Sequence, residues 1–388
     1  MMSFRKRNGK WHYRYRVMDA KTGKWKQKET RGFATKKEAT QESLKIQSEL
    51  EKGTYIQEEK ITFLDFSDKW IEIYASTGRV KDSTVRMRKA AINRVKKYLG
   101  EIKLKDISKL MYNNLLINLK NDGYARRSVA LVHEALSLLF AKAVELETIK
   151  TNPALGAEIP IYQKTVEELE SNTELPKYLE KEDLSKYLET VEQHGSLKEY
   201  TVFFLLSYTG IRVGELCALK WKDINKDEMY ISITKTLSII SSVDRYEIST
   251  PKTKSSKREV TVSEKVIQVL TRYESWLKEY KMSKRNVYKD NDFVFVNSRR
   301  TPGHPESPIH LNWCMKKYLN LAQLPNNLSP HSLRHTHVSL LAEAGVALET
   351  IQKRMGHKND RVTAEIYLHI TKTREKEASE LFEKLMDF

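Results

Sequence analysis

The stretch SPHSLRHTH, residues 329–337, holds the pattern around which the rest of the chain can be interpreted. Ser329 is a favourable N-cap and Pro330 is a favourable first helical residue, so the sequence predicts a helix that begins here. His331 and Arg334 are three positions apart and therefore share one face of that helix. On their own, the two side chains indicate no more than a satisfied surface pair.

Three further short segments in the C-terminal half carry charged or nucleophilic side chains. They are TGIRVGEL at 209–216, PKTK at 251–254, and MGH at 355–357, with Tyr367 ten positions beyond His357. Each segment is weak evidence when it is taken alone. Arg212 near a helix start can pair with Glu215 at the surface, and one tyrosine among 19 is most often a packing residue.

Together these residues suit the cleavage of a phosphodiester without a metal ion. That reaction needs cationic donors for the non-bridging oxygens, a nucleophile, and an acid for the leaving oxygen. Arg212 and Arg334 supply forked donors that stay charged at any cellular pH. Tyr367 can form a covalent phosphoester, which divides one difficult transfer into two easier ones.

Two proton transfers complete this chemistry. A tyrosine phenol has an ordinary pKa of about 10, so a base must help to remove its proton. His331 or His357 is of the right type, because imidazole titrates near neutrality. Lys252, on a predicted turn, is our first choice for protonating the departing 5′ oxygen, and Lys254 and Lys257 are close alternatives.

The charge of the chain points to a polyanionic partner. The formal net charge is +17 and the isoelectric point is about 9.5, which favours nucleic acid or an anionic membrane surface. No stretch approaches the roughly 18 apolar residues that span a bilayer. The basic N-terminus leads into no apolar segment, so no signal peptide is expected. Nucleic acid is therefore the expected partner, and no membrane is.

Residues 1–50 hold fourteen Lys or Arg against five Asp or Glu, which is more than half of the net charge. Apolar and basic residues alternate from Trp11 to Val17, and this predicts a strand with one apolar and one basic face. A second strand follows a turn, and a helix capped at Thr35 is expected to cover the sheet. We expect the basic side chains to share one face and to contact DNA in a groove. The residues concerned are Arg14, Arg16, Lys24, Lys26 and Lys28. The alternative is a solvated charged hairpin.

The fold class expected from these patterns is mainly α with small β-sheets, an α+β arrangement. A sheet-plus-helix module is assigned to 1–55, a helical domain to 62–155, a linker to 156–175, and a mixed, mostly helical domain to 176–388. In the last domain, 229–236, 246–250 and 259–262 are strand candidates. A tail helix ends the chain, with one apolar stripe. The stripe consists of Ala378, Leu381, Phe382 and Leu385.

Nothing in the sequence indicates a metal or nucleotide cofactor. Cys217 and Cys314 have no CxxC partner, so neither a zinc site nor a disulfide is expected, and a reducing cytosol fits best. His335 and His337 are two positions apart and do not share a helical face. The sequence contains no phosphate-binding GxxxxGK[ST] motif and no acidic metal cluster. We therefore expect no cofactor and no metal.

The complete set of motifs resembles the active site of the tyrosine recombinase family, in particular the integrases of phages and conjugative transposons. By this resemblance, six residues take the six active-site places: Arg212, Lys252, His331, Arg334, His357 and Tyr367. The resemblance extends over the whole chain. It implies that 1–55 is an arm-type DNA-binding domain, 62–155 a core-binding domain, and 176–388 the catalytic domain.

The resemblance also implies an activity and partners. Four protomers would join two DNA duplexes, and Tyr367 would form a 3′-phosphotyrosyl link, with a Holliday junction between two rounds of exchange. No ATP, metal or cofactor is implied, whereas a directionality factor and a host DNA-bending protein would be accessory partners. The tail helix would dock on a neighbouring protomer. The setting would be the bacterial cytoplasm, with the gene carried by a phage or another mobile element.

Three alternatives remain open at this point. They are a chromosome-dimer recombinase, a type IB topoisomerase, and a DNA-binding regulator with an inactive site. The arm-like module at 1–55 argues against the first two, and the complete set of six active-site residues argues against the third.

Overall fold

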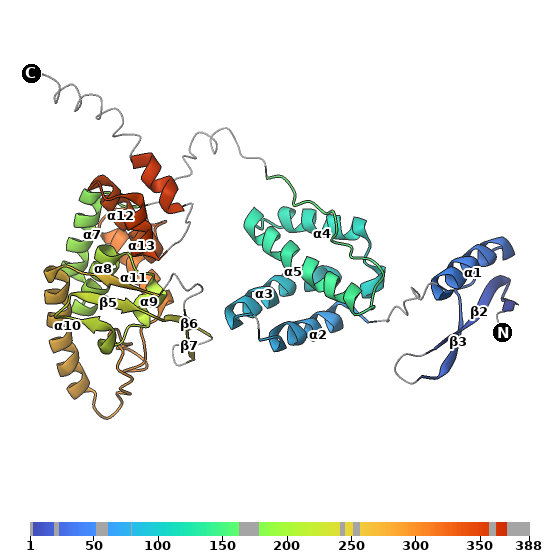
Figure 1. The fold of residues 1–388 in the computed structure, drawn as a ribbon, viewed down its shortest axis with the longest axis horizontal. Helices are drawn as coiled ribbons and strands as arrows, with labels where there is room; N and C mark the ends of the chain where they lie inside the picture. Colours follow the sequence, from blue (N-terminus) through green and yellow to red (C-terminus); the bar gives the residue numbers. More distant parts are fainter. Residues whose placement is uncertain are drawn as a thin grey trace, which may run out of the picture. The chain divides into compact units, whose positions relative to one another are not determined.

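The computed structural model describes residues 3–18, 23–51, 61–78, 80–162, 178–240, 245–250, 257–356 and 362–370. By its internal contacts the chain divides into two compact units, Met1–Gln163 and Lys164–Phe388 (Figure 1). Several predictions fall outside the described residues. They concern Lys252, Lys254, His357, most of the linker at 156–175, and the tail at 375–388.

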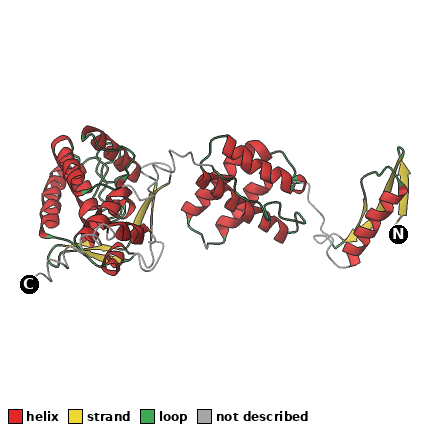
Figure 2. Ribbon diagram, turned by 90° about the horizontal axis from the view of Figure 1, so that it is seen from above, coloured by secondary structure: helices red, strands yellow, loops and turns green. Residues whose placement is uncertain are grey.

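A three-stranded antiparallel sheet, which we call the arm sheet, opens the first unit in the order β1-β2-β3. Its strands are β1 (Ser3–Arg7), β2 (Lys10–Met18) and β3 (Trp25–Glu29), and helix α1 (Lys36–Glu51) lies along one face (Figure 2). Tyr13 and Tyr15 of β2 are buried beside Ile46 of α1, as the alternation predicts. Strand β1 was not expected from the sequence, although Asn8 and Gly9, both at positive φ, form the kind of turn that closes a tight hairpin.

Four helices follow the arm sheet in the described part of the first unit. They are α2 (Phe63–Ser76), α3 (Asp82–Leu99), α4 (Lys109–Asn121) and α5 (Arg126–Glu145), with a 3₁₀ turn over Leu104–Asp106. Phe63, Phe66 and Trp70 are buried along one stripe of α2. Thr62 Oγ1 accepts the N–H of Asp65 and so caps this helix. The core of this region is therefore formed by the apolar stripes of its own helices.

The second unit is mostly helical and also contains two small antiparallel sheets. Its described helices are α7 (Lys181–His194), α8 (Leu197–Thr209), α9 (Val213–Cys217), α10 (Glu264–Ser283), α11 (Pro308–Leu321), α12 (Pro330–Glu343) and α13 (Leu348–Met355), with a 3₁₀ turn over Trp221–Asp223 and a further helix over 362–370. One sheet contains β4 (Ile224–Asn225), β5 (Tyr230–Ile233) and β8 (Arg258–Thr261), and the other contains β6 (Thr236–Ile239) and β7 (Tyr246–Ser249). The fold class is thus mainly α with small β-sheets, as predicted.

The single strand predicted over 229–236 is wrong, because this segment is divided between the two sheets. β5 ends at Ile233, which pairs with Arg258 of β8, whereas Thr236 of β6 pairs with Ser249 of β7. A strand propensity that continues across the break does not encode the change of partner. The strand candidates at 246–250 and 259–262 correspond to β7 and β8.

Helix α8 runs through the main core of the second unit. Its residues Phe203, Leu205 and Leu206 are almost completely buried, so the helix is a rigid support for the segment that follows it. None of the described helices is long and apolar enough to cross a membrane.

Candidate active site

Arg212 lies in the short connection between α8 and α9. Gly210 ends α8 in the left-handed conformation, with φ of 63°, and a Cβ there would lie 2.8 Å from the ring of His337. The backbone N–H of Arg212 donates to Glu215 Oε2 at 3.0 Å, and its Nη1 donates to Oε1 at 2.8 Å. The Arg212 side chain is 33% exposed and that of Glu215 only 2%. A buried carboxylate thus holds a guanidinium that still reaches the surface.

Arg334 is the buried member of the predicted arginine pair. Its Nη1 donates to the carbonyl oxygen of Gly210 and its Nη2 donates to that of Met355, both at 2.6 Å. These carbonyls lie at the ends of α8 and α13. Arg334 therefore joins α12 to the segment that contains Arg212 and to the turn that precedes His357.

His331 lies on the first turn of α12 and is exposed. The helix begins with Ser329 as N-cap and Pro330 as first residue, as the sequence predicts. The His331 ring packs edge-on against the ring of His335, with 4.7 Å between their centroids. His331 and Arg334 are thus on one helix, with the histidine at the surface and the arginine beneath it.

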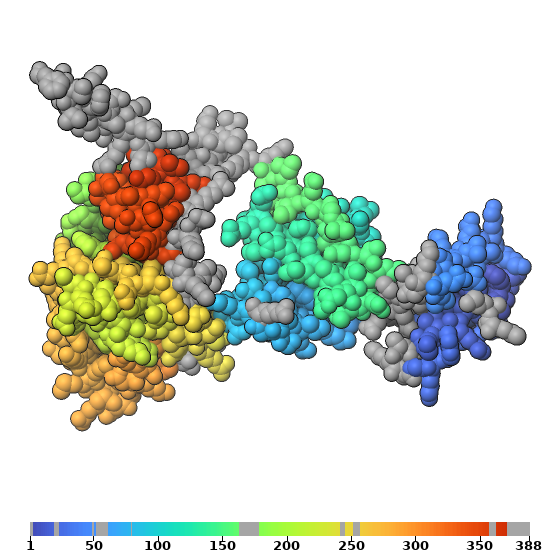
Figure 3. Space-filling view, in the orientation of Figure 1, coloured from blue at the N-terminus to red at the C-terminus, as the bar shows by residue number. Residues whose placement is uncertain are grey.

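Tyr367 lies in the helix over 362–370 and is half-buried. It packs against a small apolar cluster that includes Val338 and Ala342 of α12 and Ile351 and Met355 of α13. In the space-filling view these segments, coloured orange to red, form one contiguous block on the surface of the second unit (Figure 3). The predicted nucleophile is therefore supported by the two helices that Arg334 connects.

The other predicted catalytic residues lie outside or beside the described part of the site. Gly356 ends α13 with φ of 73°, immediately before His357. Lys252 and Lys254 precede Lys257, which is described and exposed. Their roles stay predictions.

No sequence pattern predicts the polar network around the buried ring of His337. His337 donates from Nδ1 to the carbonyl oxygen of Ser207 at 2.8 Å and accepts from Nε of Arg354 at its own Nε2, at 3.0 Å. Burial and the charge of Arg354 lower the pKa of His337 to about 3, so the ring is neutral and this tautomer is fixed by its two partners. Arg354 also donates to the carbonyl oxygen of Thr261 at 3.0 Å. The network thereby connects α8, α12, α13 and β8.

Arg258 of β8 is a further residue of the site that was not expected from the sequence. Its Nη2 lies 3.0 Å from Oε2 of Glu215, with both side chains almost fully buried. The two residues are 43 positions apart, and no local pattern marks Arg258. Only the folded chain brings this second arginine to the carboxylate that holds Arg212.

The arm sheet separates basic residues that were expected on one face. Its register pairs Arg14 with Glu29, Tyr15 with Lys28, Arg16 with Gln27, and Val17 with Lys26. Directly paired residues of an antiparallel sheet point to the same face, so Lys26 and Lys28 lie on the face that α1 covers. The expectation of one shared basic face is therefore wrong for these two lysines. Successive residues of β2 and β3 alternate between the faces, and composition alone does not tell which residues are opposite one another.

Strand β1 supplies the missing charge on the open face. Arg5 pairs with His12 and Arg7 pairs with Lys10, and these residues have the same orientation as Arg14 and Arg16. All five residues of β1 are exposed. Lys24, which precedes β3, is also exposed. The open face of the arm sheet thus carries Arg5, Arg7, Lys10, Arg14 and Arg16, with Glu29 as an acidic neighbour of Arg14.

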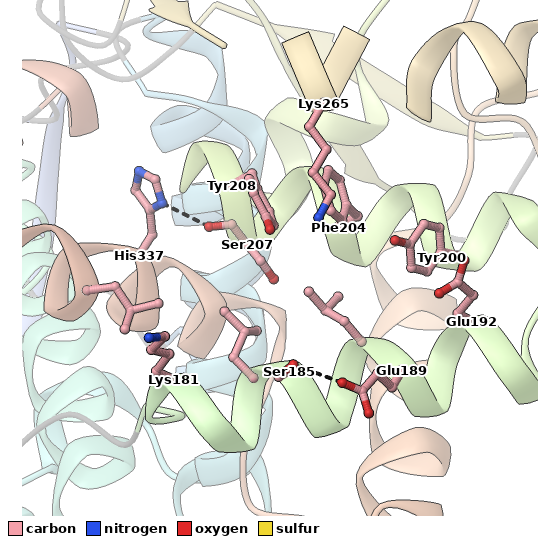
Figure 4. A pocket seen from close by; sticks show the side chains of 13 residues that line it. Lys181, Ser185, Glu189, Glu192, Tyr200, Phe204, Ser207, Tyr208, Lys265 and His337 are labelled. Carbon is pink, nitrogen blue, oxygen red and sulfur yellow. Dashed lines mark hydrogen bonds between the residues drawn. The ribbon is translucent and has the colours of Figure 1, made fainter. Parts of the chain in front are cut away.

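A cavity of about 540 Å³ lies between α7, α8 and α12 (Figure 4). Leu184 and Leu188 of α7 and Leu340 of α12 contribute apolar side chains, and Lys181 and Lys265 contribute cations. At one end, the ring of His337 points with Nδ1 toward Ser207. Neither predicted catalytic arginine lines the cavity, so it is distinct from the candidate active site.

Within the described residues, no group of three or more His, Cys, Asp or Glu is placed to hold a metal ion. Cys217 and Cys314 are buried free thiols. Burial and the charge of Glu199 raise the pKa of Cys314 to about 12, and its Sγ donates to Glu199 Oε1 at 3.4 Å. Cys314 is therefore a protonated core residue.

Three family descriptions match successive parts of the chain. The Phage integrase family matches residues 177–374, an Arm DNA-binding domain matches 3–50, and a Phage integrase SAM-like domain matches 62–159. Together the three matches extend over nearly the whole sequence.

Among individual proteins, the chain is 29% identical to the prophage ps2 probable integrase of Lactococcus lactis subsp. lactis, over 97% of this chain and 98% of that protein. It is 26% identical to the integrase of Staphylococcus phage L54a, over 88% and 98%. Among solved structures, the integrase of transposon Tn1549 in complex with a circular intermediate DNA matches with a TM-score of 0.62 at 22% identity, over 82% of this chain and 99% of that chain. A lambda integrase dimer bound to a COC′ core site matches with a TM-score of 0.56 at 19% identity, over 94% of each chain.

Proposed function

The chain belongs to the phage integrase family, and from this premise we propose that it is a site-specific tyrosine recombinase of a mobile element such as a prophage or a conjugative transposon. It cuts and rejoins DNA to integrate and excise that element. Its substrate is double-stranded DNA, and the expected reaction is a phosphoryl transfer that uses neither metal nor ATP.

One observation carries the proposal, namely the position of Arg334. Its buried guanidinium donates to the carbonyl oxygens of Gly210 and Met355. The first carbonyl is two residues before Arg212, and the second belongs to the cluster against which Tyr367 packs. This single side chain supports a site in which two arginines and a tyrosine surround one phosphate.

The residues then take the following roles. Arg212 and Arg334 bind the non-bridging oxygens of the scissile phosphate and stabilise the charge that develops in the transition state. Tyr367 Oη attacks the phosphorus, and the bond from phosphorus to the 5′ oxygen breaks. His331 or His357 accepts the phenol proton, and Lys252 donates a proton to the 5′ oxygen. The products are a 3′-phosphotyrosyl link and a 5′-hydroxyl strand.

Strand exchange is the reverse of this step with a different strand. The 5′ hydroxyl of the partner duplex attacks the phosphotyrosyl link, restores the phosphodiester, and releases the phenol of Tyr367. The covalent intermediate conserves one phosphoester bond for each that is broken, so no ATP is consumed. Two successive exchanges pass through a Holliday junction.

The assembly that we propose is a homotetramer on two duplexes. A lambda integrase tetramer has been solved on a Holliday junction. In this chain, 1–55 binds arm-type sites and 62–155 binds the core site, with a directionality factor and a host DNA-bending protein as accessory partners. The tail docks on a neighbouring protomer. Deleting 375–388 should therefore abolish synapsis in a native gel and leave the thermal melt unchanged, whereas a collapsed melt would place the tail in its own domain.

The test begins by locating the substrate in the DNA that flanks the gene. Short nicked duplexes that tile this region are mixed with the wild-type protein, because a nick next to the cleavage point lets the departing strand diffuse away and traps the covalent complex. The duplex that gives a denaturation-resistant protein–DNA band is then the core duplex. Tyr367→Phe should bind this duplex normally and give no band.

The outcomes separate the proposal from its alternatives. A persistent band with Tyr367→Phe would assign the nucleophile to another residue. Binding without any band for the wild-type protein would favour an inactive DNA-binding regulator. Relaxation of supercoiled plasmid without the core sequence would favour a topoisomerase. Full integration activity of a chain that lacks 1–55 would favour a chromosome-dimer recombinase.

A further inference from the structure

Arg258 connects two parts of the candidate active site. It begins β8, and its side chain is only 6% exposed. Its Nη2 donates to Glu215 Oε2 at 3.0 Å, and its Nε donates to the carbonyl oxygen of Arg354 at 2.8 Å. These partners are 43 and 96 positions away in the sequence. The side chain therefore spans from the start of α9 to the last turn of α13.

Glu215 shares its charge between two arginines. Its carboxylate accepts from the backbone N–H and Nη1 of Arg212 on one side and from Arg258 on the other. Burial alone would raise the pKa of Glu215, but the charge of Arg258, followed by the hydrogen bonds from Arg258 and Arg212, lowers it. Glu215 is therefore a buried anion.

The net charge of Glu215 and its two arginines determines how much positive charge Arg212 can offer to a phosphate. A buried carboxylate that paired with Arg212 alone would cancel the positive charge that Arg212 brings to a phosphate. A second arginine on the same carboxylate leaves the group of three with a net positive charge. The low polarity around buried groups makes this difference larger than it would be in water.

The second partner of Arg258 lies where α13 ends. The last carbonyl oxygens of a helix have no partner inside the helix. Here the carbonyl oxygen of Arg354 accepts from Arg258, and that of Met355 accepts from Arg334. Gly356 then turns the chain with φ of 73°. Two arginines thus fix the point from which the chain continues toward Tyr367.

We propose that Arg258 is a positioning residue for strand cleavage. It prevents Glu215 from neutralising Arg212, and it connects Glu215, which holds Arg212, to the end of α13. The inference rests on the function proposed above, because that function gives Arg212 a phosphate to bind. Arg258 acts only through its protein partners and does not touch the DNA phosphate.

The test measures covalent-complex formation by the full chain on the core duplex. Arg258→Leu should lower the cleavage rate by about 10²-fold, comparable with losing one oxyanion donor, while binding of the same duplex stays near that of the wild-type protein. The decisive variant is the double substitution Arg258→Leu with Glu215→Gln. It removes the anion that neutralises Arg212 when Arg258 is absent, so it should recover about tenfold of the lost rate, as expected for two residues that are energetically coupled.

A matched control is available in the same domain. Lys198 forms a buried ion pair with Glu306, with side chains 5% and 0% exposed, near the first residue of α8. Gly210 follows the other end of this helix, roughly 20 Å away at 1.5 Å per residue. Lys198→Met should lower the melting temperature, because it also strands a buried carboxylate. It should leave the cleavage rate of the folded protein unchanged.

Arg258→Lys keeps the proposal testable if Arg258→Leu fails to fold. The ammonium retains the charge that faces Glu215, so cleavage should stay within about tenfold of wild type. The proposal is overturned if Arg258→Leu cleaves at the wild-type rate or if the double variant is no faster than Arg258→Leu. It is also overturned if Arg258→Lys, with an unchanged melt, loses about 10²-fold or more of the wild-type cleavage rate. Failure of the proposed function differs from all of these, since the wild-type protein itself would then give no covalent complex on any duplex.

Discussion

The arm sheet and the candidate active site both present arginines, but they hold them in opposite ways. On the arm sheet, Arg16 is exposed, and Arg14 has a partner, Glu29, at a loose 3.7 Å. In the second unit, Arg334 is 2% exposed and donates to two backbone carbonyls at 2.6 Å. The arginines of the arm sheet can adjust to the DNA backbone that they bind, whereas Arg334 is held in place before any substrate binds.

This difference matches two tasks for a positive charge. Affinity for DNA needs many cations that release counterions, and their exact geometry matters little. Stabilising a transition state needs donors that are already in place, because their reorganisation would otherwise add to the barrier. The same residue type therefore tolerates substitution in one region and should not tolerate it in the other.

The largest expected effect is that of Arg334→Lys. An ammonium cannot reach both carbonyls and a phosphate with the geometry of a guanidinium, so cleavage of the core duplex should fall about 10³-fold. Arg16→Lys on the arm sheet is the matched control, and it should leave cleavage unchanged. Near wild-type cleavage by Arg334→Lys would remove the distinction between the two regions.

Lys252, as a general acid, should be distinguishable from a cation that only binds the phosphate. Lys252→Ala should lower cleavage by about 10²-fold, the lower end for a general acid. A duplex with sulfur in place of the bridging 5′ oxygen should restore the rate, because a thiolate leaves without being protonated. The same comparison with Lys254→Ala and Lys257→Ala identifies the acid. If none of the three variants is rescued by sulfur, the acid lies elsewhere.

The two faces of the arm sheet should differ in their contribution to DNA binding. Arg16 lies on the open face and Lys26 on the face of α1. On arm-site DNA, Arg16→Ala should reduce the slope of log affinity against log salt by about 0.9, the value for one phosphate contact, and should weaken binding by up to about tenfold. Lys26→Ala removes the same charge and should change neither. Equal effects would show that total charge, not the face, determines binding.

The buried histidine gives the smallest and most specific prediction. The pKa of His337 is about 3 in the folded chain, against about 6.5 when unfolded. Between these values the unfolded state binds more protons, so stability present above about pH 6.5 is lost as the pH falls, by at most about 1.4 kcal/mol per pH unit. His337→Asn should lessen the drop in melting temperature between about pH 7 and about pH 5. An unchanged pH dependence would mean that His337 is not buried as a neutral ring.

The sequence predicts this molecule best where one local pattern determines the structure. The capping residues Ser329 and Pro330 and the stripe that contains Phe63 and Trp70 follow from short-range rules, and the structure confirms them. The motifs also identify the family, because they combine residue types that one reaction requires. Arg334 is found from its spacing to His331, without any knowledge of its carbonyl partners.

The sequence predicts least where distant segments decide the outcome. The orientation of Lys26 depends on which residue of β2 faces it. Arg258 becomes significant only when β8 meets α9 and α13. The break between β5 and β6 has no local signal, since both strands have residues typical of sheets. In each case the sequence shows the residue or strand but does not show the distant segment with which it pairs.

The most direct test of the proposed function identifies the amino acid that becomes joined to DNA. Wild-type protein is trapped on the core duplex, digested with trypsin and nuclease, and the modified peptide is sequenced by mass spectrometry. We predict a nucleotide phosphate on Tyr367, in the peptide that extends from Val362 to Lys372. A nucleotide on any other residue, or a trapped complex with this peptide unmodified, would contradict the assignment of the nucleophile and the mechanism built on it.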